Sequence, residues 1–131
     1  EIALQYIDSA MMSLNEHYKK YTRTPKPHRY MKLVVKGNGY GFGIKELTAV
    51  LKESGIKTFA GTEVTDMPML KEVLNDEDIL VMRSTCIEEE AEIIAENGCT
   101  ATIGSKEACD VMNRVSARLG VKTKCHLKID T

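Results

Sequence analysis

The sequence lacks several features that identify common classes of binding protein. Its formal net charge is only −1, so its charge gives no reason to expect nucleic acid or an anionic membrane as a partner. No run of about 18 apolar residues occurs, which leaves no candidate for a transmembrane helix. It also has no G-x-G-x-x-G fingerprint and no Walker lysine motif, which argues against the common nucleotide-binding folds.

The four cysteines also lack the spacing of a known site. They stand 13, 10 and 16 residues apart, with no C-x-x-C pair. This spacing argues against a zinc ribbon or a thioredoxin-like dithiol, and we expect no metal site. We interpret them as reduced structural thiols in a protein of the cytoplasm. The residues are Cys86, Cys99, Cys109 and Cys125.

The composition is that of an ordinary globular protein. The 131 residues are 43% hydrophobic and 28% charged, which suits a single domain over residues 1–131 with a real core. The chain begins at Glu1 without a methionine and stops at or just after a predicted strand. We therefore expect it to be a piece of a longer protein.

Five short apolar runs recur along the chain and predict strands. Their starts are 25, 22, 20 and 24 residues apart. A strand and helix repeated at this interval predict parallel strands joined by right-handed crossovers. The predicted strands cover residues 32–36, 57–61, 79–83, 99–103 and 123–129.

Helix-like stretches lie between these runs. Residues 43–55 carry an apolar face and end at a glycine, and residues 64–76 predict a shorter helix around Pro68. Residues 85–98 open with Thr85 and Glu88 in the spacing of a capping box. Residues 105–120 run from a serine cap to a glycine, and residues 3–21 predict an amphipathic leading helix.

Two architectures fit this alternation: an open doubly wound sheet, or a segment of a (β/α)₈ barrel. The last predicted strand favours the barrel. Its Lys124, His126, Lys128 and Asp130 alternate with apolar residues, whereas a strand covered by helices on both faces is a continuous apolar run. We predict an α/β fold with about five parallel strands of a TIM barrel, whose chemistry lies at the carboxyl ends of the strands.

Lys36 stands at such a strand end, before the glycine-rich stretch 37–43. A lysine there is commonly a surface residue, and glycines after it commonly mark only a turn. The alternative is an amine that forms a Schiff base with a carbonyl compound. Pyridoxal phosphate is the commonest such partner, and Tyr40 could then reach its phosphate.

The stretch VVKGNGYGFG, residues 34–43, resembles the cofactor-lysine motif of the alanine racemase family, in which valine–lysine is followed by x-Asn-x-Tyr-Gly-x-Gly. The segment KCHLKIDT, residues 124–131, is similar to the family's fifth-strand segment. The opening stretch is similar too, with Asn15 at the position of a helical asparagine. The likeness covers essentially the whole chain, in the same order.

The resemblance implies a fold-type III enzyme: an N-terminal barrel, a C-terminal β domain and a homodimer that shares its active sites. It implies that Lys36 holds pyridoxal 5′-phosphate and exchanges a proton with the substrate α-carbon, and that Tyr40 contacts the cofactor phosphate. Lys128 matches a lysine that carries a carbamate in some members and orients a substrate-binding arginine. A plain ion pair with Asp130 remains the alternative for Lys128.

The chain departs from the family pattern at several positions. Gly37 and Gly39 replace alanines, Phe42 replaces a histidine, and residues 65–68 replace an acidic pair followed by alanine. The resemblance implies a pyridoxal-phosphate-dependent amino-acid racemase that interconverts L- and D-alanine by two-base transfer of the α-proton. Serine, ornithine or lysine as substrate, a fold-type III decarboxylase, or a catalytically silent fragment remain alternatives. Decarboxylases of this fold lack the Tyr-Gly-x-Gly continuation.

Overall fold

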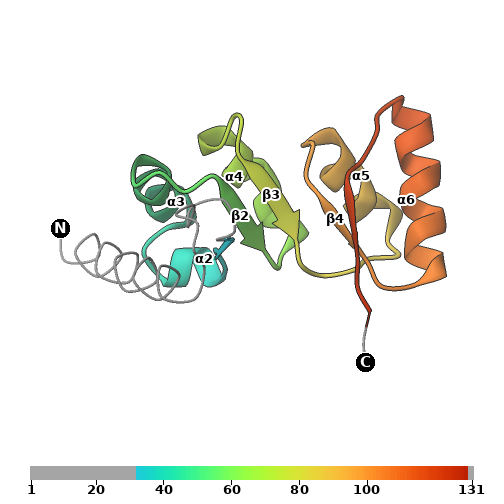
Figure 1. The fold of residues 1–131 in the computed structure, drawn as a ribbon, viewed down its shortest axis with the longest axis horizontal. Coiled ribbons are helices and arrows are strands. Elements are labelled where there is room, and N and C mark those ends of the chain that lie inside the picture. The colour runs from blue at the N-terminus through green and yellow to red at the C-terminus, as the bar shows by residue number, and fades with distance from the viewer. Residues whose placement is uncertain (1–31, 130–131) are drawn as a thin grey trace, which may run out of the picture.

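The computed structural model describes residues 32–129 of the 131-residue chain. Strands and helices alternate along it, as the spacing predicted (Figure 1). In chain order the elements are β1 Leu33–Val34, α2 Gly37–Tyr40, α3 Ile44–Glu53, β2 Thr58–Gly61, the 3₁₀ helix η2 Val64–Asp66, α4 Met67–Val73, β3 Asp78–Val81, α5 Glu88–Glu96, β4 Ala101–Ile103, α6 Lys106–Leu119 and β5 Cys125–Leu127.

The strands lie side by side in the order in which they occur in the chain. β1 pairs with β2, β2 with β3 and β4 with β5, all in parallel. A single parallel bridge between Leu80 and Thr100 joins β3 to β4. A doubly wound sheet places its first strand in the interior of the sheet, whereas sequential parallel order is that of a (β/α)₈ barrel. The predicted barrel segment is therefore confirmed, and within residues 32–129 the sheet does not close into a barrel.

The register sorts the strand side chains onto two faces. Residues paired across parallel strands point to the same side, so Val34, Ala60, Leu80 and Thr100 share one face, which we call the inner face. The opposite face carries the core, where buried strand residues pack with buried residues of the helices. The largest of these buried side chains include Val35, Phe59, Ile79 and Val81 from the strands and Leu51, Leu70 and Ile94 from the helices.

The helix ends follow the sequence in most places. Ser105 caps α6 by accepting a hydrogen bond from the Ala108 N–H at 3.1 Å, and Gly120 ends the helix with a φ of 68°. A left-handed residue at that position is the common way for a helix to stop. Pro68 lies in the first turn of α4, where its missing N–H costs nothing. These boundaries confirm the predicted helices at 105–120 and 64–76.

The capping box predicted for Thr85 and Glu88 is wrong. The Thr85 hydroxyl accepts a hydrogen bond from the Ile87 N–H at 3.1 Å and donates to Glu90. Ile87 is the residue at the cap of α5, and no side chain caps this helix. Glu88 instead accepts hydrogen bonds from Arg114 at 3.0 Å and from a second arginine of α6 at 3.2 Å. Tertiary partners therefore override the local motif, because charge-assisted bonds to arginine are stronger than a backbone cap.

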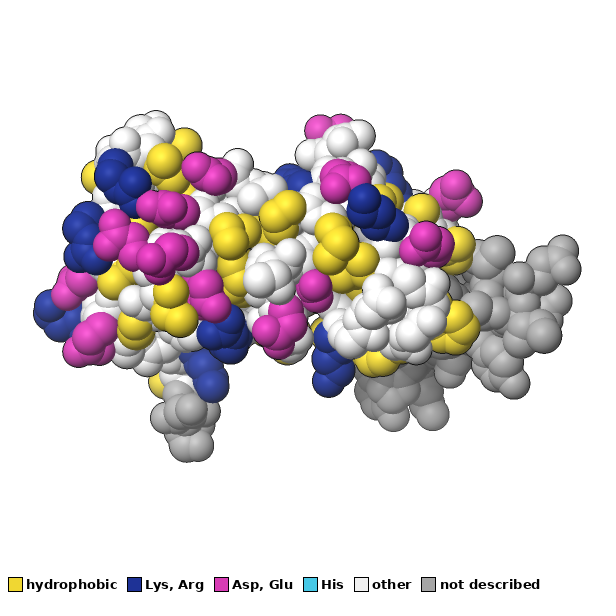
Figure 2. All heavy atoms as spheres, turned by 180° about the vertical axis from the view of Figure 1, so that it is seen from behind, with side chains coloured by type: hydrophobic (Ala, Val, Ile, Leu, Met, Phe, Trp, Pro, Cys, Tyr) yellow, Lys and Arg dark blue, Asp and Glu magenta, His cyan; other side chains and the backbone are white. Residues whose placement is uncertain are grey.

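The α5–α6 end of the molecule is covered by acidic and basic side chains that lie close together (Figure 2). Arg118 adds a contact with Glu92 to its contact with Glu88. The hydrogen bond from Arg114 is the main cause that lowers the pKa of Glu88. Because all these side chains reach solvent, the pairs orient α6 on α5 and contribute little free energy.

Candidate functional site

Lys36 lies two residues after the last residue of β1, at the carboxyl end of the sheet. The backbone remains extended there, with φ −148° and ψ 171°, so the alternation of the strand continues. Val35 is fully buried in the core, and Lys36, like Val34, therefore belongs to the inner face. In the structure of this chain, the Lys36 side chain is exposed to solvent. A lysine on the inner face of a barrel segment, at its carboxyl end, occupies the region where barrel enzymes carry their chemistry.

The chain after Lys36 forms one turn of left-handed helix. The φ angles of Gly37, Asn38, Gly39 and Tyr40 are 56°, 50°, 65° and 56°. The Tyr40 N–H donates to the Lys36 carbonyl at 2.9 Å, which closes the turn. Left-handed backbone disfavours side chains with a Cβ, so two glycines and an asparagine suit this turn. The glycines that replace alanines thus lie where they relieve strain.

Tyr40 is the strained residue of this turn, because a bulky side chain rarely adopts a positive φ. The turn carries its ring back to β1, where the hydroxyl donates to the Val34 carbonyl at 3.3 Å. Tyr40 and Lys36 therefore lie at the same strand end, although four residues separate them. Strain of this kind persists only where surrounding contacts hold it, and such positions cluster at functional sites.

Asn38 secures the turn to the following helix. Its Oδ1 accepts a hydrogen bond from the Ile44 N–H at 3.3 Å, at the start of α3. Phe42, by contrast, has 67% of its surface exposed. Residues 34–43, the motif identified in the sequence, thus form one structural unit. Hydrogen bonds join the end of β1, the left-handed turn and the start of α3.

Lys128 lies one residue beyond β5, and its N–H donates to the Ile103 carbonyl at 2.8 Å. It lines a hollow at the carboxyl ends of β3, β4 and β5. The structure does not bring Lys128 and Lys36 together, because β2, β3 and β4 lie between their strands. Both nevertheless belong to the same end of the inner face. The other residues that line this hollow are Met82, Arg83, Ser84, Cys86, Gly104 and Ser105.

Arg83 lines the same hollow as Lys128. The sequence analysis did not identify it as a candidate. Its guanidinium donates to Glu90 at 2.6 Å, and this bond raises the pKa of Arg83. The bonds from Arg83 and Thr85 in turn lower the pKa of Glu90. Because its charge is neutralised at close range, Arg83 supports α5 and is a poor candidate for binding a ligand.

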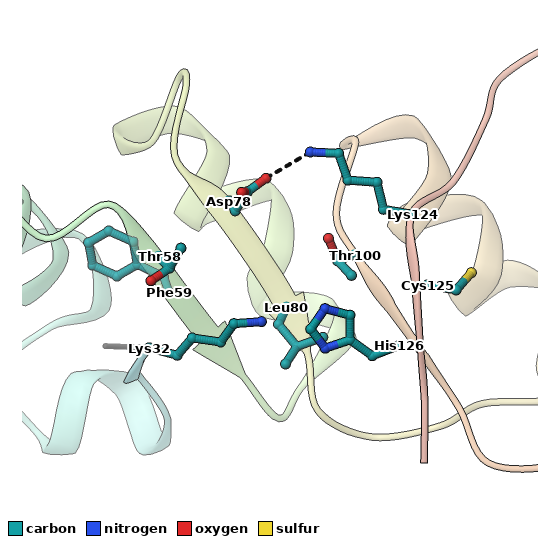
Figure 3. A pocket seen from close by; sticks show the side chains of 9 residues that line it. All are labelled: Lys32, Thr58, Phe59, Asp78, Leu80, Thr100, Lys124, Cys125 and His126. Atoms are coloured by element: carbon teal, nitrogen blue, oxygen red, sulfur yellow. Dashed lines mark hydrogen bonds and ion pairs between the residues drawn. The ribbon is translucent and has the colours of Figure 1, made fainter. Parts of the chain in front are cut away.

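A second hollow, at the amino ends of the strands, was also missed. Asp78 and Lys124 form an ion pair of 3.0 Å in it, and Lys32 and His126 line it from the two outermost strands (Figure 3). The alternation of lysine and histidine in the last strand was the signal that pointed to this polar inner face. The alternation alone did not indicate which residues of the other strands would face them.

Several residues of the sequence argument lie outside the described residues: Asn15, Asp130 and the leading helix among them. Within residues 32–129, no group of three or more histidine, cysteine, aspartate or glutamate side chains is arranged to hold a metal ion. The four cysteines are free thiols. Burial raises the pKa of Cys99 to about 11, which fits a structural thiol rather than a reactive one.

Comparison with known proteins gives a consistent result. The family model described as "Alanine racemase, N-terminal domain" matches residues 11–131. The alanine racemase of Methanococcus maripaludis is 29% identical over 121 residues, which cover 92% of this chain and 32% of that protein. The alanine racemase of Pediococcus pentosaceus is 32% identical over 104 residues, covering 79% of this chain and 27% of that protein.

Solved structures agree. Alanine racemase from Clostridium difficile 630, in complex with cycloserine, superimposes with a TM-score of 0.69 at 27% identity and covers 76% of this chain and 26% of that one. Histidine racemase from Leuconostoc mesenteroides shares the fold, with a TM-score of 0.67 at 20% identity over 89% of this chain. The chain spans between a quarter and a third of the length of these relatives. It belongs to the alanine racemase family, as part of the N-terminal domain.

Proposed function

We propose that this chain is the N-terminal part of a pyridoxal-phosphate-dependent amino-acid racemase and that Lys36 is the residue to which the cofactor attaches. One observation carries the proposal. Lys36 lies at the carboxyl end of the inner face, and a strained left-handed turn returns Tyr40 to the same strand end. The match of residues 11–131 to the family model of the alanine racemase N-terminal domain supports the proposal.

The residues present fit such a cofactor. An exposed amine and an exposed phenol stand at one strand end, and Gly37 and Gly41 leave open space where a Cβ would lie. The Tyr40 hydroxyl has only a long bond to the Val34 carbonyl, so it is able to donate to a phosphate oxygen instead. When bound, the cofactor acts as an electron sink that stabilises negative charge on the substrate α-carbon.

Racemisation requires one group on each face of the α-carbon, because one removes the proton and the other returns it from the opposite side. We assign the first role to the Nζ atom of Lys36. The resemblance implies that a tyrosine of the partner subunit's C-terminal domain, which lies outside this chain, takes the second. The full-length protein is then a homodimer of the cytoplasm. Within residues 32–129 no helix is long and apolar enough to cross a membrane.

Lys128 is assigned to the substrate side of the site. It lines the hollow at the carboxyl ends of β3 to β5, where its amine, or a carbamate formed on it, would orient a substrate-binding arginine from the rest of the protein. Alanine is the substrate that we propose first. A histidine racemase shares this fold. We therefore propose that the residues around the substrate side chain decide which amino acid reacts. Serine, ornithine and lysine are to be assayed beside alanine.

The decisive experiment is borohydride reduction of the full-length protein loaded with pyridoxal phosphate, followed by peptide mass spectrometry. We expect the label on Lys36, and we expect Lys36→Ala to lose the visible absorbance of the lysine-bound cofactor. Tyr40→Phe should keep the attachment and weaken cofactor affinity about tenfold, since one hydrogen bond to a charged group is lost. Lys45→Ala serves as the matched lysine control. A label on any other side chain would refute the assignment of Lys36.

A further inference from the structure

The hollow at the amino ends of the strands lies on the same inner face as Lys36 but at the opposite end of the sheet. It has a volume of about 200 Å³. The apolar side chain of Leu80 and polar groups from the amino ends of the strands line it. The full lining consists of Lys32, Thr58, Phe59, Asp78, Leu80, Thr100, Lys124, Cys125 and His126.

The charges in this hollow do not balance. Lys124 and Asp78 neutralise one another at 3.0 Å. Lys32 and His126 make no ion pair or side-chain hydrogen bond with the residues that the structure describes. Figure 3 shows the Lys32 side chain reaching over β2 toward Leu80, with the His126 ring directed to the same place from β5. Both side chains therefore line the part of the hollow beside Leu80.

We propose that this hollow binds a small tetrahedral oxyanion such as inorganic phosphate, held by Lys32 and His126. A lysine ammonium offers three donors and no acceptor, and a histidine ring has at least one N–H donor in either protonation state. Charge-assisted hydrogen bonds of this kind are stronger than those between neutral groups. A cation is excluded as the ligand, because Asp78, the one carboxylate in the lining, is already paired.

The preference for a tetrahedral oxyanion follows from the donors in the hollow. Lys32 supplies a positive charge that no described side chain neutralises, and His126 supplies an N–H donor. Lys124 adds a donor at the edge of the hollow, where its ammonium is shared with Asp78. A tetrahedral oxyanion has enough oxygen atoms to accept from all three, whereas a carboxylate has two. The site is independent of the proposed function, because it lies at the other end of the strands from Lys36.

The test is isothermal titration of the full-length, cofactor-saturated protein with sodium phosphate. Saturation with cofactor keeps added phosphate out of the proposed cofactor site. We expect Lys32→Met and His126→Leu each to weaken phosphate binding at least tenfold. Lys122→Met, which removes an exposed lysine outside the hollow, should leave the affinity within twofold of wild type. Lys32→Arg should retain most of the affinity, which separates loss of charge from loss of fold.

Equal phosphate affinity in wild type and Lys32→Met would overturn the proposal, as would the absence of any phosphate binding by the wild-type protein. Acetate provides the second arm, and we expect it to bind at least tenfold more weakly than phosphate. Acetate binding as tight as phosphate binding would overturn the assignment to tetrahedral oxyanions. The comparison of Lys32→Met with wild type holds whether or not Lys36 carries the cofactor, so failure of one proposal is distinguishable from failure of the other.

Discussion

The carboxylate of Asp78 and the ammonium of Lys124 form an ion pair of 3.0 Å that links β3 to β5 across β4 (Figure 3). The pair spans the weakest part of the sheet, because a single bridge between Leu80 and Thr100 joins β3 to β4. The two ladders are thus joined by one backbone bridge, by this ion pair and by a hydrogen bond of 2.6 Å from the Thr102 hydroxyl to the Val81 carbonyl.

Removing this ion pair should cost little, because both side chains are well exposed, at 61% and 72%. We expect the double-mutant cycle of Asp78→Asn and Lys124→Met in the full-length protein to give a coupling free energy of about 1 kcal/mol or less. The coupling should shrink in 1 M salt, where charges are screened within about 3 Å. Urea unfolding measures both values. A coupling that is unchanged in high salt would contradict an electrostatic link.

Gly43 should be the least replaceable glycine of the turn that follows Lys36. It caps α3 with φ 88° and ψ 129°, a backbone conformation that residues with a Cβ rarely adopt. The Glu46 carboxylate, 2.1 Å from an added Cβ, is the end of a flexible side chain and is able to move away. We expect Gly43→Ala to lower the free energy of unfolding by about 1–3 kcal/mol. Gly37→Ala is the matched control, since its φ of 56° lies in the left-handed region, which residues with a Cβ adopt at smaller cost. Equal costs for the two variants would show that the backbone conformation of Gly43 does not decide the cost.

Glu77 is a buried carboxylate that stabilises the back of the sheet. Its side chain is 4% exposed, with the amines of Lys52 and Lys57 at 3.4 and 3.6 Å. The geometry is that of an ion pair rather than of a hydrogen bond, and Oε2 has no hydrogen-bond partner. Burial raises the pKa of Glu77, but a backbone hydrogen bond and the two lysines outweigh burial, so the pKa lies below its ordinary value of 4.5.

Glu77→Gln should therefore lower the free energy of unfolding at pH 7 by about 1–2 kcal/mol, since Lys52 loses its buried partner. A depressed folded pKa stabilises the protein above pH 4.5, and this contribution is lost as pH falls from 4.5 through the folded value. The difference between wild type and variant should narrow in that range. Glu72→Gln, which alters an exposed pair, should change stability by less than about 0.5 kcal/mol. Equal stability of wild type and Glu77→Gln at pH 7 would contradict the assignment.

The outward side of β5 should promote association of the isolated chain. Leu127 and Ile129 are 76% and 80% exposed, and exposed apolar strands at a sheet edge invite pairing. We expect light scattering to detect association of the 131-residue chain at micromolar concentration and Leu127→Lys to reduce it. Met69→Lys, on α4, is the control for the removal of an exposed apolar side chain. A clean monomer across this range would refute the prediction.

Local patterns were sufficient where one element decides its own structure. Ser105 and Gly120 bound α6 as a cap and a stop, because both signals act through the nearest backbone groups. The same logic failed at Thr85 and Glu88. Their partners are Glu90 and two arginines of another helix, and sequence spacing does not report contacts between elements. The sequence indicated the left-handed turn only in part. The glycines of residues 37–43 predicted an unusual backbone conformation, but they did not predict that it would be left-handed.

The sequence by itself determined that five parallel strands alternate with helices, because each segment carries its own pattern of apolar and polar residues. It also determined that Lys36 and Lys128 stand at strand ends, because each lysine comes at the end of a predicted strand. The left-handed turn, which only the structure shows, returns Tyr40 to the end of β1. Only the tertiary structure decided that the strands lie in chain order and that Lys32 and His126 face one hollow. Those relationships depend on the register between strands, which is set by packing over long sequence separations.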